Sequence, residues 1–355
     1  MTDNIFDRLA ELLSSSGPVN WGLAGELGSS VAGDPGTVPP GADAYWAGLA
    51  DTANRVLGEA SAIDLTPPAV SAVDRRQWTT HTISGFDYLA EPLATKLGAD
   101  DGAMFAPVVS IMLGLQIGSM AGSISHRALG SFDAALPPLN ADRLYFIAPN
   151  ITEFTDSLGL DGNQAHLWVA AHELVAHRLL GLAPLRDRFR SLIKTYIDGL
   201  ELDSDALPLE NLDAGFDPER LGQMMQDPSF LTGMFTGPHQ EEDLADIQAF
   251  LAVVEGYVEH LLNQLDPKLM PELPRIREGV DRRRATPSQG EAFLQKMLGI
   301  ELQRPTYRAG AEFFAEIERR FGSESATTVF SGGDAMPSLH ELDDPVGWAA
   351  RTLLS

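Results

Sequence analysis

The sequence contains no cysteine among its 355 residues. Disulfides, thiolate metal sites and cysteine nucleophiles are therefore excluded, and any transition-metal site has to use His, Asp or Glu. Positive charge is scarce as well, because 25 Lys and Arg stand against 50 Asp and Glu, which gives a formal charge of −25. So acidic a chain repels phosphates and anionic bilayers, and we expect neither nucleic acid nor a membrane as partner.

Targeting signals and long apolar runs are also rare. The first 17 residues are acidic and lack the basic and apolar regions of a signal peptide, which predicts a cytoplasmic protein. Residues 103–126 carry no fixed charge and are long enough to cross a bilayer. However, Gly114, Gly118 and Gly122 recur at every fourth position, where they line one helix face that another backbone can approach closely. We therefore expect a buried central helix.

Apolar periodicity predicts a mainly α (α+β) fold with many helices and one small sheet. The strand candidate is 142–151, where a β-prone run ends at Pro149. Residues 24–42 are rich in Gly, Pro and Ser and predict a loop. We expect two parts: an N-terminal helix and linker over 1–45, and one domain over 46–355. The expected helices are 4–15, 42–59, 102–129, 163–180, 218–226, 244–265, 290–300 and 306–321.

The stretch "AHELVAHR" places His172 and Glu173 side by side on the helix 163–180. Zinc peptidases use His-Glu-x-x-His, where the two imidazoles share one helix face and the Glu activates a water. Here Ala176 occupies the fifth position, and His177 lies one residue later, about 140° round the axis from His172. By spacing alone, an ordinary helix with two histidines remains a valid interpretation.

A second helix, 244–265, carries Glu255 and Glu259 four residues apart in an apolar setting. A buried carboxylate needs a partner, because an unpaired buried charge is costly. A metal would serve, and so would an arginine such as Arg178 or one of the cluster 282–284. The spacing leaves both partners open. The arginines between 275 and 284 are expected to pair with the chain's own acids rather than with an acidic partner.

Several motifs in order resemble an actinobacterial zincin-like family of hydrolases or zinc-dependent metalloproteases whose function is unknown. They are "GPVNW", "LYFIAPNITEF", "LWVAAHELVAHRLL", "VVEGYVEH" and "PSLHELDDPVGWAAR". The resemblance implies a zincin-like metallopeptidase fold and a zinc cofactor. It implies that His172 and Glu255 are metal ligands, that Glu173 is the catalytic base, and that Glu259 orients a ligand from behind. Ala176 stands where the family has its second histidine.

Losing that imidazole has chemical consequences. Catalytic zinc usually has three protein ligands and a water, so we expect zinc-dependent peptide hydrolysis to be lost or strongly weakened. Without the cation, Glu173 or Glu255 should be partly protonated, or paired with His172 as imidazolium. Rescue by His177 or His166 would need a change of helix face.

The alternative function is a non-catalytic descendant that keeps the cleft for a peptide or protein. A purely structural role is a third possibility. Residues 201–243 are a candidate lid over the cleft. Nothing in the sequence indicates the oligomeric state.

Overall fold

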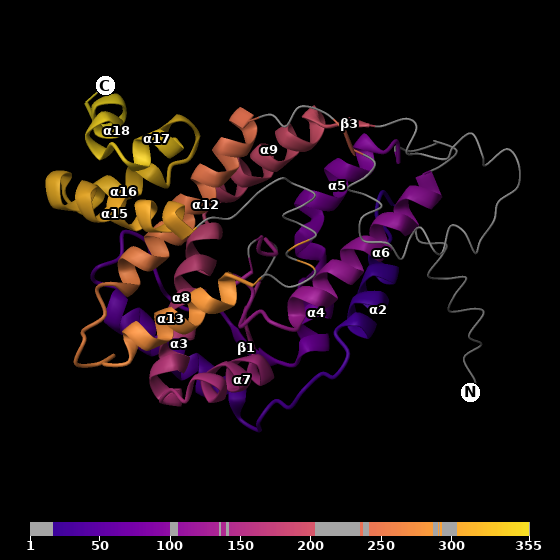
Figure 1. The fold of residues 1–355 in the computed structure, drawn as a ribbon, viewed down its shortest axis with the longest axis horizontal. Helices are drawn as coiled ribbons and strands as arrows, with labels where there is room; N and C mark the ends of the chain where they lie inside the picture. The colour runs from indigo at the N-terminus through magenta and orange to yellow at the C-terminus, as the bar shows by residue number, and fades with distance from the viewer. Residues whose placement is uncertain are drawn as a thin grey trace, which may run out of the picture.

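The computed structural model describes residues 17–99, 106–134, 136–139, 142–202, 235–236, 241–286, 290, 292 and 304–354. Helices make up most of this part, as the sequence predicts (Figure 1). The expected helices 4–15 and 218–226 lie outside the described residues. So do nearly all of the expected helix 290–300 and of the candidate lid 201–243.

The helices form three groups (Figure 1). One group lies at the right of the view: α2 (Trp21–Val31), α4 (Arg75–Thr82), α5 (Asp87–Lys96) and α6 (Ala106–Ser125). The other contains α3 (Ala42–Leu57), α7 (Ala148–Leu158), α8 (Gly162–Leu180), α9 (Ala183–Gly199), α12 (Glu241–Leu262) and α13 (Leu273–Arg284). At the upper left lie α15 (Arg304–Phe321), α16 (Glu324–Val329), α17 (Leu339–Leu342) and α18 (Pro345–Thr352).

A small parallel sheet lies between the groups. Strand β2 (Leu144–Ile147) confirms the predicted strand and pairs with β1 (Val70–Val73) in register from Val70–Leu144 to Val73–Ile147. Phe146 also pairs with Gly130 in an isolated antiparallel bridge. The sequence missed β1, because four residues after two prolines give too short a pattern. A second pair, β3 (Glu201–Leu202) and β4 (Phe235–Thr236), is antiparallel.

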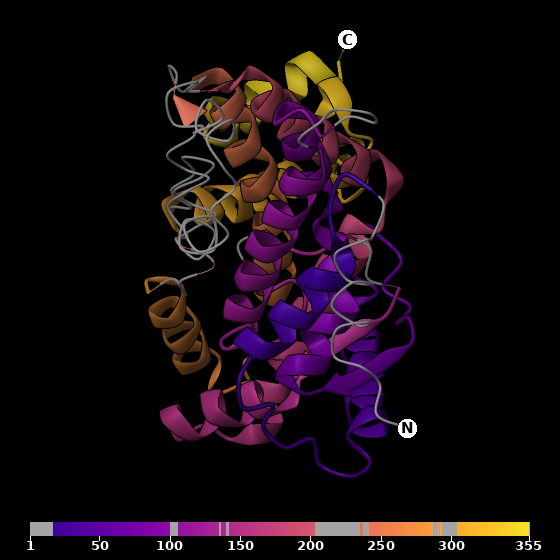
Figure 2. The same cartoon turned by 90° about the vertical axis from the view of Figure 1, so that its right-hand side faces the viewer.

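The glycine face of α6 packs directly against α2, as predicted, and both views show the two helices side by side (Figures 1 and 2). A Cβ added at Gly114, Gly118 or Gly122 would lie 2.5–2.6 Å from a backbone oxygen of residues 20–28. The apolar helix is thus a core helix, with 72% of its apolar window buried.

The packing of α2 on α6 also explains why the loop predicted for residues 24–42 is wrong in its first part. Residues 24–31, expected in a loop, belong to α2. Gly25 and Gly28 weaken an isolated helix. At Gly28, however, the missing side chain lets α2 approach α6, since a Cβ there would lie 3.0 Å from Gly118 O. Tertiary packing therefore overrides the local preference. The proposed division after residue 45 stays a prediction.

A second close approach fixes α12. A Cβ on Gly310 of α15 would lie 2.1 Å from Ala252 O, and one on Gly256 would lie 2.5 Å from the Gly310 carbonyl carbon. His260 and Glu318 add an Nε2–Oε2 contact of 2.8 Å between the same two helices. Helix α12 is therefore held rigidly at the residue that follows Glu255.

We predict that Gly118→Ala destabilises the protein by about 1–3 kcal/mol, because the new methyl must push α2 and α6 apart. Gly48→Ala is the matched control: Gly48 lies on the exposed face of α3 with nothing within 4 Å of its added Cβ. That change should stabilise by up to about 1 kcal/mol through helix propensity. Urea unfolding measures both, and effects of the same sign would contradict the packing.

Candidate functional site

Helix α8 carries the His-Glu pair and begins and ends where the sequence predicts. The Asp161 side chain caps it by accepting from Asn163 N at 2.9 Å, and the last helical residue is Leu180. Gly181 follows with φ −70°, so it ends the helix in the right-handed region, not as a left-handed glycine. Apolar residues surround the axis. His172 and Glu173 are therefore buried, at 3% and 0% exposure.

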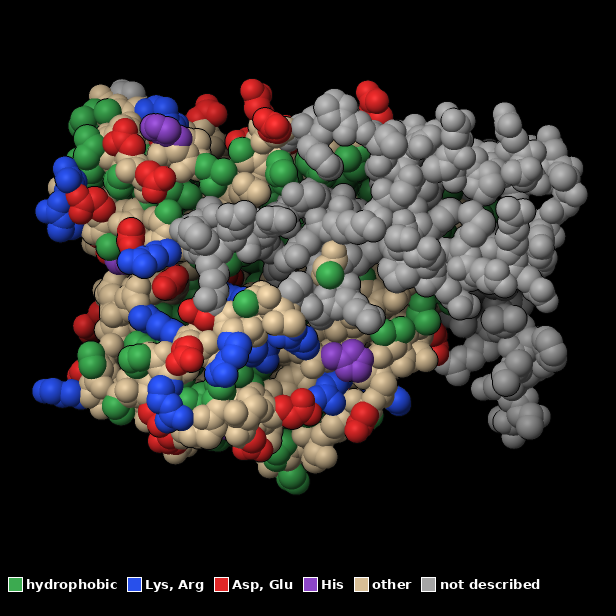
Figure 3. All heavy atoms as spheres, viewed as in Figure 1, with side chains coloured by type: hydrophobic (Ala, Val, Ile, Leu, Met, Phe, Trp, Pro, Cys, Tyr) green, Lys and Arg blue, Asp and Glu red, His purple; other side chains and the backbone are tan. Residues whose placement is uncertain are grey.

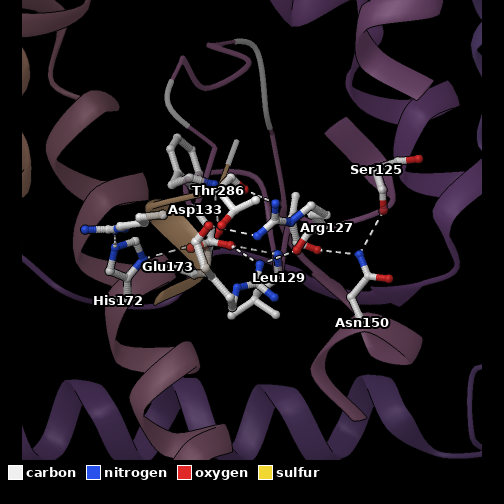
Figure 4. Close-up of polar contacts among 12 residues, drawn as sticks. Ser125, Arg127, Leu129, Asp133, Asn150, His172, Glu173 and Thr286 are labelled. Carbon is white, nitrogen blue, oxygen red and sulfur yellow. Dashed lines mark hydrogen bonds and ion pairs between the residues drawn. The ribbon is translucent and has the colours of Figure 1, made fainter. Parts of the chain in front are cut away.

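The structure brings His172, Glu173 and Glu255 together. His172 Nδ1 lies 3.4 Å from Glu173 Oε1, and its Nε2 lies 3.5 Å from Glu255 Oε2. The ring of Trp168, one turn earlier on α8, stacks on His172 with 5.2 Å between centroids. Figure 4 shows His172 and Glu173 directed toward each other. The imidazole is thus fixed between two carboxyl groups from two helices.

Arg284, the last residue of α13, reaches the same point. Its Nη2 donates to Glu255 Oε2 at 2.8 Å and lies 3.1 Å from His172 Nε2. Of the two partners left open for Glu255, the structure therefore contains the arginine. Arg178, the other candidate, pairs with Asp64 instead. The sequence missed that residues 273–284 are helical, which is what carries Arg284 there.

The charges of this group follow from burial and contact. Burial lowers the pKa of His172, but the contacts with Glu173 and Glu255 outweigh it and raise the pKa to about 9. Burial raises the pKa of Glu255, but Arg284 and His172 lower it to about 2. Burial also raises the pKa of Glu173, and His172 reverses this only in part. The carboxyl groups of Glu173 and Glu255 thus favour the protonated form of His172.

The segment 128–134 packs directly against Glu173. Its Oε2 accepts from Phe132 N at 2.8 Å. Gly130 lies so near that an added Cβ would be 2.3 Å from the same oxygen. Asp133 holds the segment in place by accepting from Leu129 N at 3.1 Å and from Arg283 Nη2 at 3.0 Å (Figure 4). No periodic pattern in the sequence marks this segment, so its contact with Glu173 was not predicted.

Three further positions are candidates for the second ligand: Ala176, His177 and His166. Ala176 is 1% exposed and offers no donor atom. The ring of His177 meets Phe132 edge-on at 5.5 Å. His166 Nδ1 lies 2.8 Å from the Tyr45 hydroxyl, in a separate hollow. Each of these two rings thus has an aromatic or hydrogen-bonding neighbour other than His172.

A small cavity of about 80 Å³ opens beside His172. Its apolar lining residues are Trp168, Val258, Leu262 and Val280, and its charged ones include Glu255, Glu259, Arg277 and Arg284. Burial lowers the pKa of Arg277, and the charge of Glu259 opposes this shift. The Glu259 carboxylate thus stabilises the charged form of an arginine that lines the cavity. Apolar walls with a few convergent charges are typical of a binding site.

The residues present do not fit a zinc ion. One imidazole and one carboxylate remain of the three ligands that catalytic zinc needs. The Arg284 guanidinium stands between those two groups and would repel a second cation. Among the described residues, no group of three or more His, Asp or Glu has the geometry to hold a metal.

Comparisons with known proteins agree with the fold. The family model of the zincin-like metallopeptidases matches residues 19–349. A crystal structure of a "putative hydrolase with a novel fold" from Chloroflexus aurantiacus is 21% identical and superposes with a TM-score of 0.68. That match covers 95% of this chain and 99% of the other. No curated protein matches. With the model matching nearly the whole length, the chain belongs to the zincin-like metallopeptidase family.

Proposed function

We propose that this chain has lost the zinc-dependent peptide hydrolysis of its family and keeps the cavity beside His172 to bind a segment of a peptide or protein. The observation that carries the proposal is the position of Arg284. Its guanidinium, held to both Glu255 and His172, supplies the positive charge that a metal would otherwise supply.

The position of Glu173 gives further support. A general base must reach the proton that it abstracts, directly or through one water. Glu173 is fully buried, accepts a backbone N–H and does not line the cavity. Its carboxyl therefore holds the segment 128–134 in place. The cavity itself admits a small side chain between apolar walls. We propose that the partner is a peptide or protein met in the cytoplasm.

We predict that Arg284→Met destabilises the protein by about 1–3 kcal/mol, because it leaves Glu255 with a weaker partner in a largely buried place. Arg275→Met on the same helix is the control. Its pair with Glu272 is 55% exposed on the arginine side, so about 0–1 kcal/mol is expected. Urea unfolding at pH 7 compares the two. Equal losses would show that Arg284 is only a surface contact.

We predict that the wild type binds no stoichiometric zinc after dialysis, whereas Ala176→His combined with Arg284→Met does. The double change restores a third ligand and removes the competing cation, and Ala176→His alone should gain little. Metal content and competition with a chelating dye measure the binding. Adding His172→Ala to the double variant should abolish it. One zinc retained per wild-type chain would sink the proposal.

We predict that peptides selected for binding to the wild type lose at least tenfold in affinity on Glu259→Lys, which reverses a charge inside the cavity. Glu278→Lys, on the exposed surface of α13, is the matched control and should change affinity little. Fluorescence polarisation with synthetic peptides measures both. A synthetic panel with no binder, or equal effects of the two changes, would argue against the cavity as the binding site.

A further inference from the structure

Helix α13 separates the His172 cavity from a second, larger hollow on its opposite face. This hollow has a volume of about 530 Å³ and lies between α13, α7 and the end of α6. The residues of α13 that line it are Gly279, Arg282 and Arg283, whereas Arg277, Val280, Asp281 and Arg284 line the first cavity. His126, Arg127, Glu153 and Phe154 complete its main walls. Nothing in the proposed function uses this hollow.

The hollow carries an excess of positive charge. Arg127, Arg282 and Arg283 line it, and among the described residues of its lining Glu153 is the only acid. Glu153 is neutralised by Arg75, at 2.5 Å between Nη2 and Oε1, and Arg283 is neutralised by Asp133. Arg282 makes no ion pair or hydrogen bond within the described part of the chain. Two guanidinium charges, those of Arg127 and Arg282, are thus left without a carboxylate.

The arginines are held in place by neutral groups. Arg127 donates through Nη2 to Arg283 O at 2.8 Å and through Nη1 to Thr286 O. Arg283 donates in return to Arg127 O, and its guanidinium lies over the Phe154 ring at 5.3 Å. Figure 4 shows Arg127 directed toward Thr286. Carbonyl groups fix the geometry without cancelling the charge, so the site is organised before any ligand arrives.

Lys and Arg side chains also gather over α13 on the face seen in Figure 3. The whole chain carries −25. A nucleic acid or an anionic bilayer would meet this repulsion over a wide surface, whereas a small anion in a hollow meets mainly the local field within about 10 Å. Two uncompensated guanidiniums match a doubly charged anion better than a carboxylate, and guanidinium forks match phosphate oxygens.

The geometry points to a binding site for a phosphoryl dianion, carried on a small soluble phosphomonoester, in the hollow formed by Arg127, Arg282 and Arg283. The volume exceeds that of a bare phosphate and leaves room for an organic group beside Phe154. The site differs from the cavity that the proposed function uses, so either can fail alone. It also departs from the expectation that the arginines 275–284 serve only internal acids.

Isothermal titration of the full chain with inorganic phosphate and with glycerol phosphate, at constant ionic strength, tests the site. We expect one saturable site for both, and at least fivefold weaker binding in Arg282→Gln. Arg282 is exposed and unpaired, so this variant should fold normally. Arg275→Gln, on the same helix but outside the hollow, is the control and should bind like the wild type.

Sulfate should compete with phosphate, and acetate should not. Four results would overturn the proposal. They are no saturable binding, equal weakening by Arg282→Gln and Arg275→Gln, competition by acetate as strong as by sulfate, or binding of inorganic phosphate without glycerol phosphate. The last would mark an adventitious ion only. Arg282→Gln lies outside the His172 cavity, so loss of phosphate binding with unchanged peptide binding would separate this site from the proposed function.

Discussion

The site depends on how the neighbours of His172 compensate for the burial of its polar ring, which is 3% exposed. Two carboxyl groups face its two ring nitrogens, and a guanidinium reaches both the ring and Glu255. Bringing these groups out of water is costly unless each finds opposite charge or a hydrogen bond. Arg284 supplies the positive charge opposite Glu255. It reaches this point because it is the last residue of α13, where it contacts His172 of α8 and Glu255 of α12.

Two further parts of the chain pack against this group of charged side chains. Arg284 contacts Glu255 and His172, and the segment 128–134 packs against Glu173. The segment 128–134 and helix α13 are linked by an ion pair, because Asp133 of the segment pairs with Arg283, the neighbour of Arg284. Glu173, the candidate base, is not among the residues that line the cavity beside His172.

Helix α13 is the element on which both proposed sites depend. One face directs Arg284 and Arg277 to the small cavity, and the other directs Arg282 and Arg283 to the larger hollow. Adjacent residues on a helix point about 100° apart, so a run of three arginines necessarily serves more than one side. The run that looks like a single basic cluster in the sequence is therefore divided between two environments.

Features set by local spacing could be read from the sequence. The apolar periods of α8 and α12, the strand at Leu144–Ile147 and the glycine face of α6 all appear in the structure. Strand β1 and helix α2 could not be read, because four residues give too little pattern and because glycines favour a helix only when a neighbour packs on them.

The sequence by itself determined which groups were available for chemistry: His172, Glu173 and Glu255, with no imidazole at position 176 and no cysteine anywhere. Only the tertiary structure decided what those groups do. Arg284 meets Glu255 across 29 residues and His172 across 112, and Phe132 meets Glu173 across 41. Such contacts follow from how helices pack, which residue spacing within one helix does not specify.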